Sequence, residues 1–406
     1  MTDRWHRTLL PIVVRGYYRR VDVVGPMPPA RGPLLLVGLH RNGAVDGMVY
    51  KTVVRRATFL VAARLLRGPL ARLFFAGIPV ARARDAATDA AADAARAGGR
   101  PDNAAALRAA GDLLAGGGAL FVFPEGTSDL GPRHLPFHRG AAVIAAEALR
   151  RGVPLTVVPA GIFYTAPERF RSDVAVVFGA PLRTDGDDGL TPDAATLHRR
   201  ITAALEALGV NVATAEQLAS IEALATLGAE ESAARRYRAL KALEREAPPA
   251  EVAAAWRDVH AALARGGLVG VDGVPLRSRR GPAWNAAWLA LQAAAVAAGA
   301  VANVVPLAGA YLASRRLADG RNTIALWRLL VGAPLCAAWA AAWLVLGAVA
   351  GVAWPLGWAL ATGAGTVAWP ELRARWPRLR NALSRDRDAL AALTLVQAWT
   401  RALAHD

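Results

Sequence analysis

The feature that most constrains the fold is a series of short apolar runs between residues 21 and 211, each bounded by glycine, proline or polar residues. The clearest runs are Leu34–Val37, Thr58–Val61, Ala119–Phe123, Leu155–Pro159 and Val174–Phe178. Runs of this length with such boundaries predict buried strands. Polar or alanine-rich stretches of helical composition separate them. The pattern therefore predicts an α/β domain with a mixed, largely parallel sheet and helices on both faces.

The segments on either side of residues 21–211 predict helices. Residues 1–20 mix arginine with apolar residues and lack the clean apolar core of a signal peptide, so they predict a basic amphipathic helix. This helix could lie on a membrane surface or pack on the α/β domain, and the sequence favours neither. Residues 212–280 are rich in Ala, Glu, Leu and Arg and predict a helical connector.

The C-terminal part, residues 281–406, contains two long runs without a charged residue, 281–314 and 329–370. Because a membrane-spanning helix needs roughly 20 apolar residues, the second run is long enough for two spans. Arginine clusters flank both runs, and the positive-inside rule would place these clusters on one side of a membrane. We therefore expect two membrane hairpins, 281–314 and 329–370, and a basic helical tail. The alternative is an alanine-rich helical bundle buried inside a soluble protein.

Composition narrows the possible partners and the chemistry. The net charge is +16, and the basic clusters flank apolar segments without any aromatic-rich basic motif. This favours anionic lipid over nucleic acid as the partner. The single cysteine, Cys336, excludes an intramolecular disulfide and a metal site built from cysteines.

A histidine and a carboxylate share one short polar loop directly after the run Leu34–Val37. His40 and Asp46 lie in the stretch Gly-Leu-His-Arg-Asn-Gly-Ala-Val-Asp-Gly. A histidine at the end of a strand can take a proton from a hydroxyl while a carboxylate holds its other ring nitrogen. Taken alone, the pair is more often a loop-capping arrangement, so the rest of the chain must decide between the two interpretations.

Three further elements follow in order. Gly77–Arg82 places an arginine after a short strand-like piece, where a guanidinium can bind a phosphate. Phe123–Ser128 runs from a buried strand into a Pro-Glu-Gly turn, whose carboxylate and hydroxyls could bind an acceptor or hold the histidine loop. Val157–Gly161 is a strand that we expect to end at Pro159 and Gly161. Each element is weak alone, because solvated arginines and Pro-Gly turns are common.

Together the four elements resemble the PlsC-like family of glycerolipid acyltransferases, over roughly residues 5–200. His40 and Asp46 look like the form of the first motif with five intervening residues, and the later elements are similar to motifs two to four. The chain departs from the common pattern at three places. Leu39 replaces the usual Asn, Arg41 stands where Pro is frequent, and Ser128 occupies a place often taken by Arg in lysophosphatidate enzymes.

The resemblance implies an O-acyltransferase that moves an acyl group from acyl-CoA or acyl-carrier protein to a hydroxyl of a glycerol-phosphate or lysophospholipid acceptor. It implies these site residues: His40 and Asp46 as catalytic residues, Arg82 on the acceptor phosphate, Glu125, Gly126 and Thr127 around the acceptor, and Pro159 in the fourth motif. We expect no metal or cofactor beyond the acyl donor, and a catalytic domain on the cytoplasmic face of the membrane. The alternatives are acylation of an amino-lipid or glycolipid, and a non-catalytic lipid-binding membrane protein.

Overall fold

The computed structural model describes residues 2–66, 68–81, 103–185, 191–229, 232–278 and 280–404, and within these residues one sheet has seven strands. The strands are β1 (Arg20–Val24), β2 (Leu34–Gly38), β3 (Ala57–Ala62), β4 (Gly77–Val80), β5 (Ala119–Val122), β6 (Thr156–Tyr164) and β7 (Asp173–Phe178). Their order in the sheet is β1-β7-β6-β2-β5-β3-β4. The pairs from β6 to β4 are parallel and β7 is antiparallel to β6. The predicted mixed, largely parallel sheet is confirmed.

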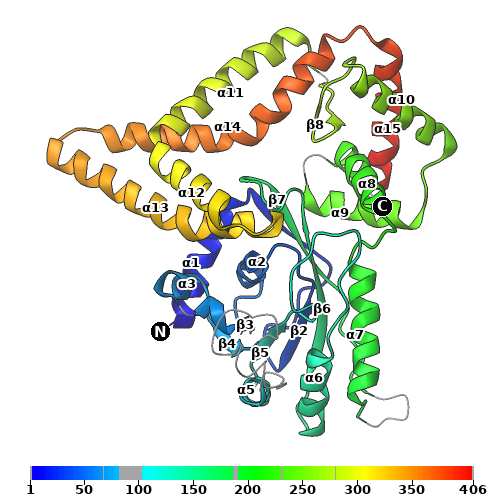
Figure 1. Ribbon diagram of the computed structural model, residues 1–406, viewed down its shortest axis with the longest axis vertical. Helices are drawn as coiled ribbons and strands as arrows, with labels where there is room; N and C mark the ends of the chain where they lie inside the picture. The colour runs from blue at the N-terminus through cyan, green and yellow to red at the C-terminus, as the bar shows by residue number, and fades with distance from the viewer. Residues whose placement is uncertain are drawn as a thin grey trace. The chain divides into compact units, whose positions relative to one another are not determined.

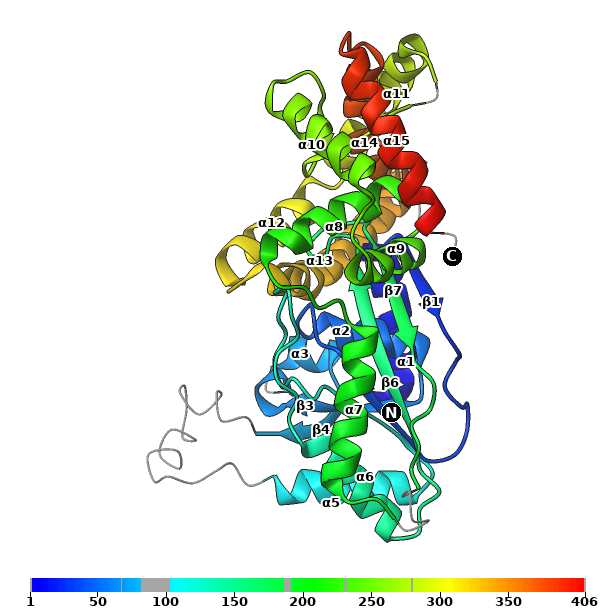
Figure 2. The ribbon, with the colours of Figure 1, turned by 90° about the vertical axis from the view of Figure 1, so that its right-hand side faces the viewer.

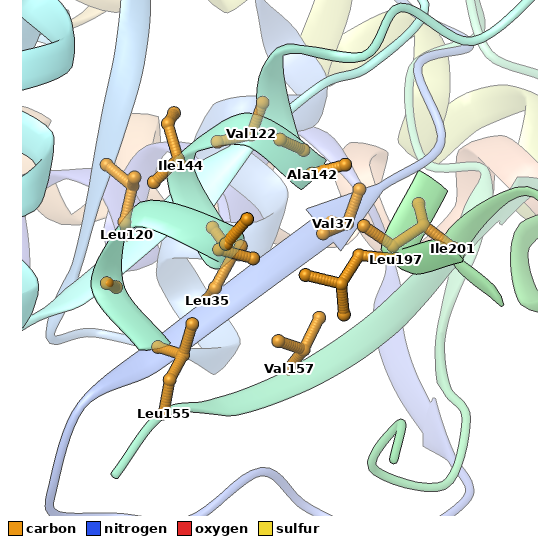
Figure 3. Close-up of a cluster of buried hydrophobic side chains, with 14 of the residues drawn as sticks. Leu35, Val37, Leu120, Val122, Ala142, Ile144, Leu155, Val157, Leu197 and Ile201 are labelled. Carbon is orange, nitrogen blue, oxygen red and sulfur yellow. The ribbon is translucent and has the colours of Figure 1, made fainter. Parts of the chain in front are cut away.

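Helices cover both faces of this sheet (Figures 1 and 2). They are α1 (Thr2–Tyr17), α2 (Val45–Val53), the short 3-10 helix η1 (Ala63–Leu66), α3 (Pro69–Phe74), α5 (Ala104–Ala115), α6 (Gly140–Arg150) and α7 (Ala194–Leu208). Successive side chains of a strand point to opposite faces. Leu35 and Val37 accordingly join the hydrophobic core with α5, α6 and α7 (Figure 3). On the other face, Phe121 packs against Tyr50 of α2 with ring centroids 4.4 Å apart.

Helix α1 packs on the domain through one side. Leu10, Val13 and Val14 are buried, and α1 contacts α2 and α3. Trp5 and Ile12 lie on the opposite side and are exposed. Of the two roles that the sequence left open for this helix, the structure shows the packed one.

Strand β6 is longer than expected, and this corrects the interpretation of Pro159 and Gly161 as a strand end. The strand does not end at Pro159 but runs on to Tyr164. A proline lacks the N–H that a strand interior normally needs. Here the Pro159 carbonyl accepts a hydrogen bond from the Gly179 N–H at 3.0 Å, just beyond the last pair of the β6–β7 ladder. The N–H that Pro159 lacks therefore belongs to a position just past the end of the β6–β7 ladder.

The chain divides into two compact units. The first comprises residues 1–168, 174–211 and 320–326, and the second comprises residues 169–173, 212–319 and 327–406. The first unit thus contains helix α1, the predicted α/β region except residues 169–173, and a short segment from much later in the chain, Gly320–Leu326.

The second unit is mainly helical. Its elements are α8 (Ala215–Gly228), α9 (Ala233–Arg245), α10 (Ala250–Ala264), β8 (Gly270–Val271), β9 (Val274–Pro275), α11 (Pro282–Ala302), α12 (Val304–Leu317), α14 (Trp354–Ala382), α15 (Arg387–Leu403) and most of α13 (Arg321–Ala350). Helix α15 packs against α8 and α10 and buries Leu393 and Val396. The region predicted as a connector therefore shares a core with the helical tail.

Among the described residues, two helices are long and apolar enough to cross a membrane. They are α11, with a mean hydropathy of 1.4 in its most apolar window, and α13, with 2.0. Only 17% of each window is buried, whereas the core helix of a soluble protein would be mostly buried. Helix α14 is not one of them, because its sequence is rich in Trp, Gly, Thr, Pro and, towards its end, Arg, and is less apolar than α11 and α13.

The apolar helices pair differently from the two hairpins that the sequence predicts. Helix α11 runs along α14 rather than folding back along α12 (Figure 1). Gly299 and Gly365 allow this close approach, because their Cα atoms lie where a side chain on either would clash. Asn303, at the break between α11 and α12, donates to the Thr362 hydroxyl at 2.8 Å and accepts from the Trp358 indole at 3.2 Å. Small residues and polar contacts, which a charge pattern does not reveal, select this pairing.

Candidate active site

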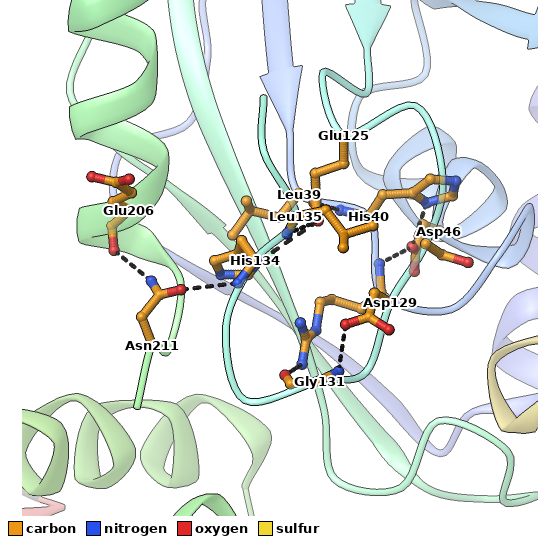
Figure 4. A network of polar contacts seen from close by, with 12 residues as sticks. Leu39, His40, Asp46, Glu125, Asp129, Gly131, His134, Leu135, Glu206 and Asn211 are labelled. Carbon is orange, nitrogen blue, oxygen red and sulfur yellow. Dashed lines mark hydrogen bonds and ion pairs between the residues drawn. The ribbon is translucent and has the colours of Figure 1, made fainter. Parts of the chain in front are cut away.

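The site lies at the carboxyl ends of two neighbouring parallel strands. Strand β2 leads into His40 and strand β5 leads into Glu125, and the two strands pair directly. Since parallel strands end at the same edge of a sheet, their following loops meet there. Asp46 comes from the first turn of α2, which begins at Val45 directly after the histidine loop. Local chain order and strand pairing thus bring these three residues together (Figure 4).

His40 and Asp46 form a hydrogen-bonded pair. The His40 Nδ1 lies 2.9 Å from Asp46 Oδ2, and both side chains are buried. The imidazole stacks on Phe123 with ring centroids 4.3 Å apart, which fixes the plane of the ring. Within the described residues, Nε2 has no hydrogen-bond partner and remains available to a substrate hydroxyl. The geometry is that of a base oriented by a carboxylate.

The surroundings of Asp46 donate hydrogen bonds to both of its carboxylate oxygens. Its Oδ2 accepts hydrogen bonds from the N–H groups of Arg41 at 2.6 Å and Asn42 at 2.8 Å. Its Oδ1 accepts from the Tyr164 hydroxyl at 2.6 Å. Asp46 also lies in the first turn of α2, where the helix dipole favours negative charge. When Nδ1 of His40 donates its proton to the hydrogen bond with Oδ2, the Nε2 lone pair of the neutral imidazole is free to act as a base.

Two residues of this network were missed by sequence reasoning. Tyr164 contributes its hydroxyl from the end of β6, and burial together with the nearby Asp46 charge raises its pKa well above the usual value, so it stays a donor. Asn42 is fully buried and donates to the Tyr18 hydroxyl at 2.9 Å and to the Pro167 carbonyl at 3.0 Å. Asn42 stood inside the predicted motif and could have been singled out, whereas nothing in the local sequence pointed to Tyr164.

Glu125 holds the histidine loop. Its Oε1 accepts from the His40 N–H at 2.7 Å and its Oε2 from the Leu135 N–H at 3.3 Å (Figure 4). The side chain is 2% exposed, and this burial raises its pKa to about 7 despite the two backbone hydrogen bonds. The sequence left open whether Glu125 binds an acceptor or holds the loop, and these contacts describe the second role.

The other predicted site residues fall into different places. Gly126 adopts a φ of +69°, which favours glycine, and a Cβ there would lie 3.2 Å from the His138 ring. Thr127 follows in the same loop and is half-buried. Pro159 lies inside β6 beside Val37 of β2, so it belongs to the sheet beneath the site. Arg82 lies outside the described residues.

Comparison with known proteins shows that the α/β region is similar to one family. Residues 20–163 match the family described as Acyltransferase. An uncharacterized acyltransferase of Schizosaccharomyces pombe is 39% identical over 71 residues, 17% of this chain and 10% of that protein. Glycerol-3-phosphate O-acyltransferase 2 of Saccharomyces cerevisiae is 33% identical over 90 residues, 22% of this chain and 12% of that protein. The matches thus span only about a tenth of each of these two relatives.

A solved structure is also similar in part. The crystal structure of the 1-acyl-sn-glycerophosphate (LPA) acyltransferase PlsC from Thermotoga maritima aligns at 18% identity over 52% of this chain and 79% of that chain, with a TM-score of 0.33. The family match covers the strands and loops that hold His40, Asp46 and Glu125. The family resemblance seen in the sequence is confirmed over this region: the residues that carry it, except those of α1, lie within the match to the acyltransferase family at residues 20–163.

Proposed function

We propose that this protein transfers an acyl group from acyl-CoA or acyl-carrier protein to a hydroxyl of a glycerol-phosphate or lysophospholipid acceptor in phospholipid synthesis. The observation that carries the proposal is the His40–Asp46 pair, in which Nδ1 is bound at 2.9 Å and Nε2 is left for a substrate. The acyltransferase match over residues 20–163 supports the same reaction class.

The proposed reaction is a direct transfer. Nε2 of His40 accepts the proton of the acceptor hydroxyl as its oxygen attacks the thioester carbonyl carbon. The tetrahedral intermediate then expels the thiolate, which takes the proton back from the imidazolium. Asp46 stabilises the imidazolium, and Glu125 fixes the histidine backbone. Backbone N–H groups would stabilise the oxyanion.

The proposal includes neither an acyl-enzyme intermediate nor a metal. A thioester is already activated toward a hydroxyl, and a buried base with its orienting carboxylate supplies the remaining proton transfer. Activity should therefore survive dialysis against a chelator. Labelled acyl group should not remain on the protein when the acceptor is omitted.

A second acceptor class, an amino-lipid or glycolipid, has one observation in its favour. Ser128 stands where lysophosphatidate enzymes often carry an arginine, and here its hydroxyl accepts from the Asn322 amide at 2.8 Å. A neutral pair at this position attracts a phosphate less than a guanidinium would. Under the leading proposal, Arg82 binds the acceptor phosphate instead.

We also propose that the protein acts at the cytoplasmic face of a membrane. The exposed apolar windows of α11 and α13 support an embedded C-terminal region. Residues 320–326 belong to the same compact unit as the acyltransferase sheet, so this stretch and the catalytic domain must lie on one side. A cysteine at Ala318, in a Cys336→Ser background, should react with an impermeant maleimide only when the cytoplasmic face is open.

Incubation of the purified full-length protein in phospholipid vesicles with labelled acyl-CoA and a panel of acceptors tests the function. The panel contains glycerol 3-phosphate, lysophosphatidate, an amino-lipid and a glycolipid. We expect label in the product of a phosphorylated acceptor, and an Arg82→Ala variant should lose that preference. Transfer to the unphosphorylated acceptors alone would favour the second class, and no transfer from either CoA or carrier-protein thioesters would contradict the proposal.

A further inference from the structure

A short segment from the C-terminal half of the chain packs within the acyltransferase unit. Gly320–Leu326 lies far beyond the family match at residues 20–163, yet it clusters in the first compact unit. It contains the first turn of α13, and the rest of that helix belongs to the second unit. The segment continues into the second unit at both of its ends and is itself part of the unit that holds His40.

Asn322 binds the loop that carries Glu125. Its amide nitrogen donates to the Ser128 hydroxyl at 2.8 Å and to the Ser128 carbonyl at 3.0 Å, which uses both hydrogens of the amide. The next residue, Asp129, donates its N–H to the His40 carbonyl at 3.2 Å. Asn322 thus binds Ser128, the residue next to the one whose N–H joins the Glu125 loop to the His40 carbonyl.

The backbone of Asn322 also lies close to the histidine loop, at Gly43. A Cβ at Gly43 would lie 2.8 Å from the Asn322 carbonyl oxygen and 3.7 Å from a methyl carbon of Thr323. Gly43 has a φ of +56° and its carbonyl accepts from the Asp46 N–H at 3.2 Å. The backbone of the 320–326 segment therefore lies directly against the turn that presents Asp46.

The segment is itself held in place. The Thr323 hydroxyl donates to the Gly320 carbonyl at 3.0 Å, which ties the first turn of α13 to the residue before it. Arg321 forms an ion pair with Glu168 of the first unit at 3.1 Å, and Ala325 and Leu326 are buried. These contacts hold Asn322 beside both the histidine loop and the Glu125 loop.

We propose that the 320–326 segment is a positioning element of the acyl-transfer site, in which Asn322 fixes the Glu125 loop through Ser128 while its backbone packs against the histidine loop at Gly43. The inference rests on the proposed function and assigns this role to a part of the chain outside the family match. Because Asn322 acts through the loops that hold His40, its loss should affect the chemical step more than the binding of either substrate.

Kinetics of Asn322→Ala and of the isosteric Asn322→Asp, which lacks both amide donors, test this role. We expect kcat per folded molecule to fall roughly tenfold in each, with the KM of donor and acceptor unchanged, since two hydrogen bonds are lost. Asn303→Ala is the matched control, because Asn303 bonds to Thr362 within the second unit and should leave kcat unchanged. A lower melting temperature with wild-type kcat per folded molecule would overturn the positioning role.

Hydrogen exchange on the same full-length variants separates this inference from the proposed function. In Asn322→Ala, peptides covering residues 38–47 and 123–130 should exchange faster than in the wild type, and in Asn303→Ala they should not. Unchanged exchange in both peptides would overturn the inference even if the protein is an active acyltransferase. A wild type without acyl transfer would end the proposed function, and the exchange result would still decide whether Asn322 holds the loops.

Discussion

The Tyr164 hydroxyl donates a hydrogen bond of 2.6 Å to Oδ1 of Asp46, from a position 118 residues further along the chain. Both side chains are buried. The carboxylate that orients His40 is therefore held by its own loop and by the far end of a central strand. This contact depends on β6 continuing past Pro159 to Tyr164.

Replacing Tyr164 by phenylalanine should lower both stability and turnover. The change removes the hydrogen bond to Oδ1 of a buried carboxylate, at a cost of about 1–3 kcal/mol in the free energy of unfolding. We expect kcat to fall roughly tenfold, because Asp46 then holds the histidine less firmly. Urea denaturation and steady-state kinetics measure the two effects. Tyr50→Phe is the control, since that hydroxyl makes only a 3.4 Å contact with the Leu39 carbonyl. Equal effects in both variants would contradict the role given to Tyr164.

Glu125 should make stability depend on pH. Its pKa is raised from 4.5 to about 7 by burial, so the folded protein retains a proton that the unfolded chain releases near pH 4.5. The stabilisation from that proton is fully present below pH 4.5 and is lost as pH rises through 7. From the shift, the free energy of unfolding should fall by up to about 3 kcal/mol across this window.

Glu125→Gln isolates this contribution, because glutamine has nearly the same shape and does not titrate. The difference in unfolding free energy between the wild type and this variant should shrink or reverse as pH rises through the window. Glu147→Gln on α6 is the matched control, as Glu147 is exposed and paired with Arg150 on the surface. If the wild type and Glu125→Gln show the same pH slope, burial does not govern the titration of Glu125.

Two glycines of the histidine loop and α2 should respond to alanine in opposite ways. At Gly43, alanine meets both a φ of +56° and the Asn322 carbonyl oxygen at 2.8 Å, so we expect a loss of about 1–3 kcal/mol. At Gly47, inside α2, an added Cβ meets only Phe59 at 3.8 Å, and alanine should stabilise by about 0.5–1 kcal/mol. Thermal unfolding of the two variants measures both. Similar shifts in the same direction would show that the close approach of the 320–326 segment is not present in solution.

The parts of the site that could be predicted from sequence are those set by local order. His40 and Asp46 lie in one loop before α2, and Glu125 follows a strand that pairs with the strand before His40. Parallel strand ends meet at one edge of the sheet, so the pattern alone indicates that these residues converge. The sheet was also predictable from local order, since turn residues bound each buried apolar run.

The remainder depends on contacts that no local spacing encodes. Tyr164 and Asn322 reach the site from distant segments, and neither lies in a pattern with the histidine loop. Pro159 and Gly161 resemble a strand end, yet the ladder between β6 and β7 tolerates the missing Pro159 N–H because it lies just past the last pair. The pairing of α11 with α14 depends on Gly299 and Gly365 rather than on charge. Composition identifies apolar helices but does not choose their partners.

The role proposed for His40, oriented by Asp46, is that of the base for acyl transfer. Its most direct test is the rate of thioester-dependent acylation by purified full-length His40→Ala and Asp46→Asn, each checked for wild-type folding by circular dichroism. General-base catalysis contributes a factor of about 100 to 10,000, so we predict a loss of at least about a hundredfold in kcat for His40→Ala. Asp46→Asn should lose a similar amount, because the orienting carboxylate is gone. Wild-type turnover in folded His40→Ala would contradict the account.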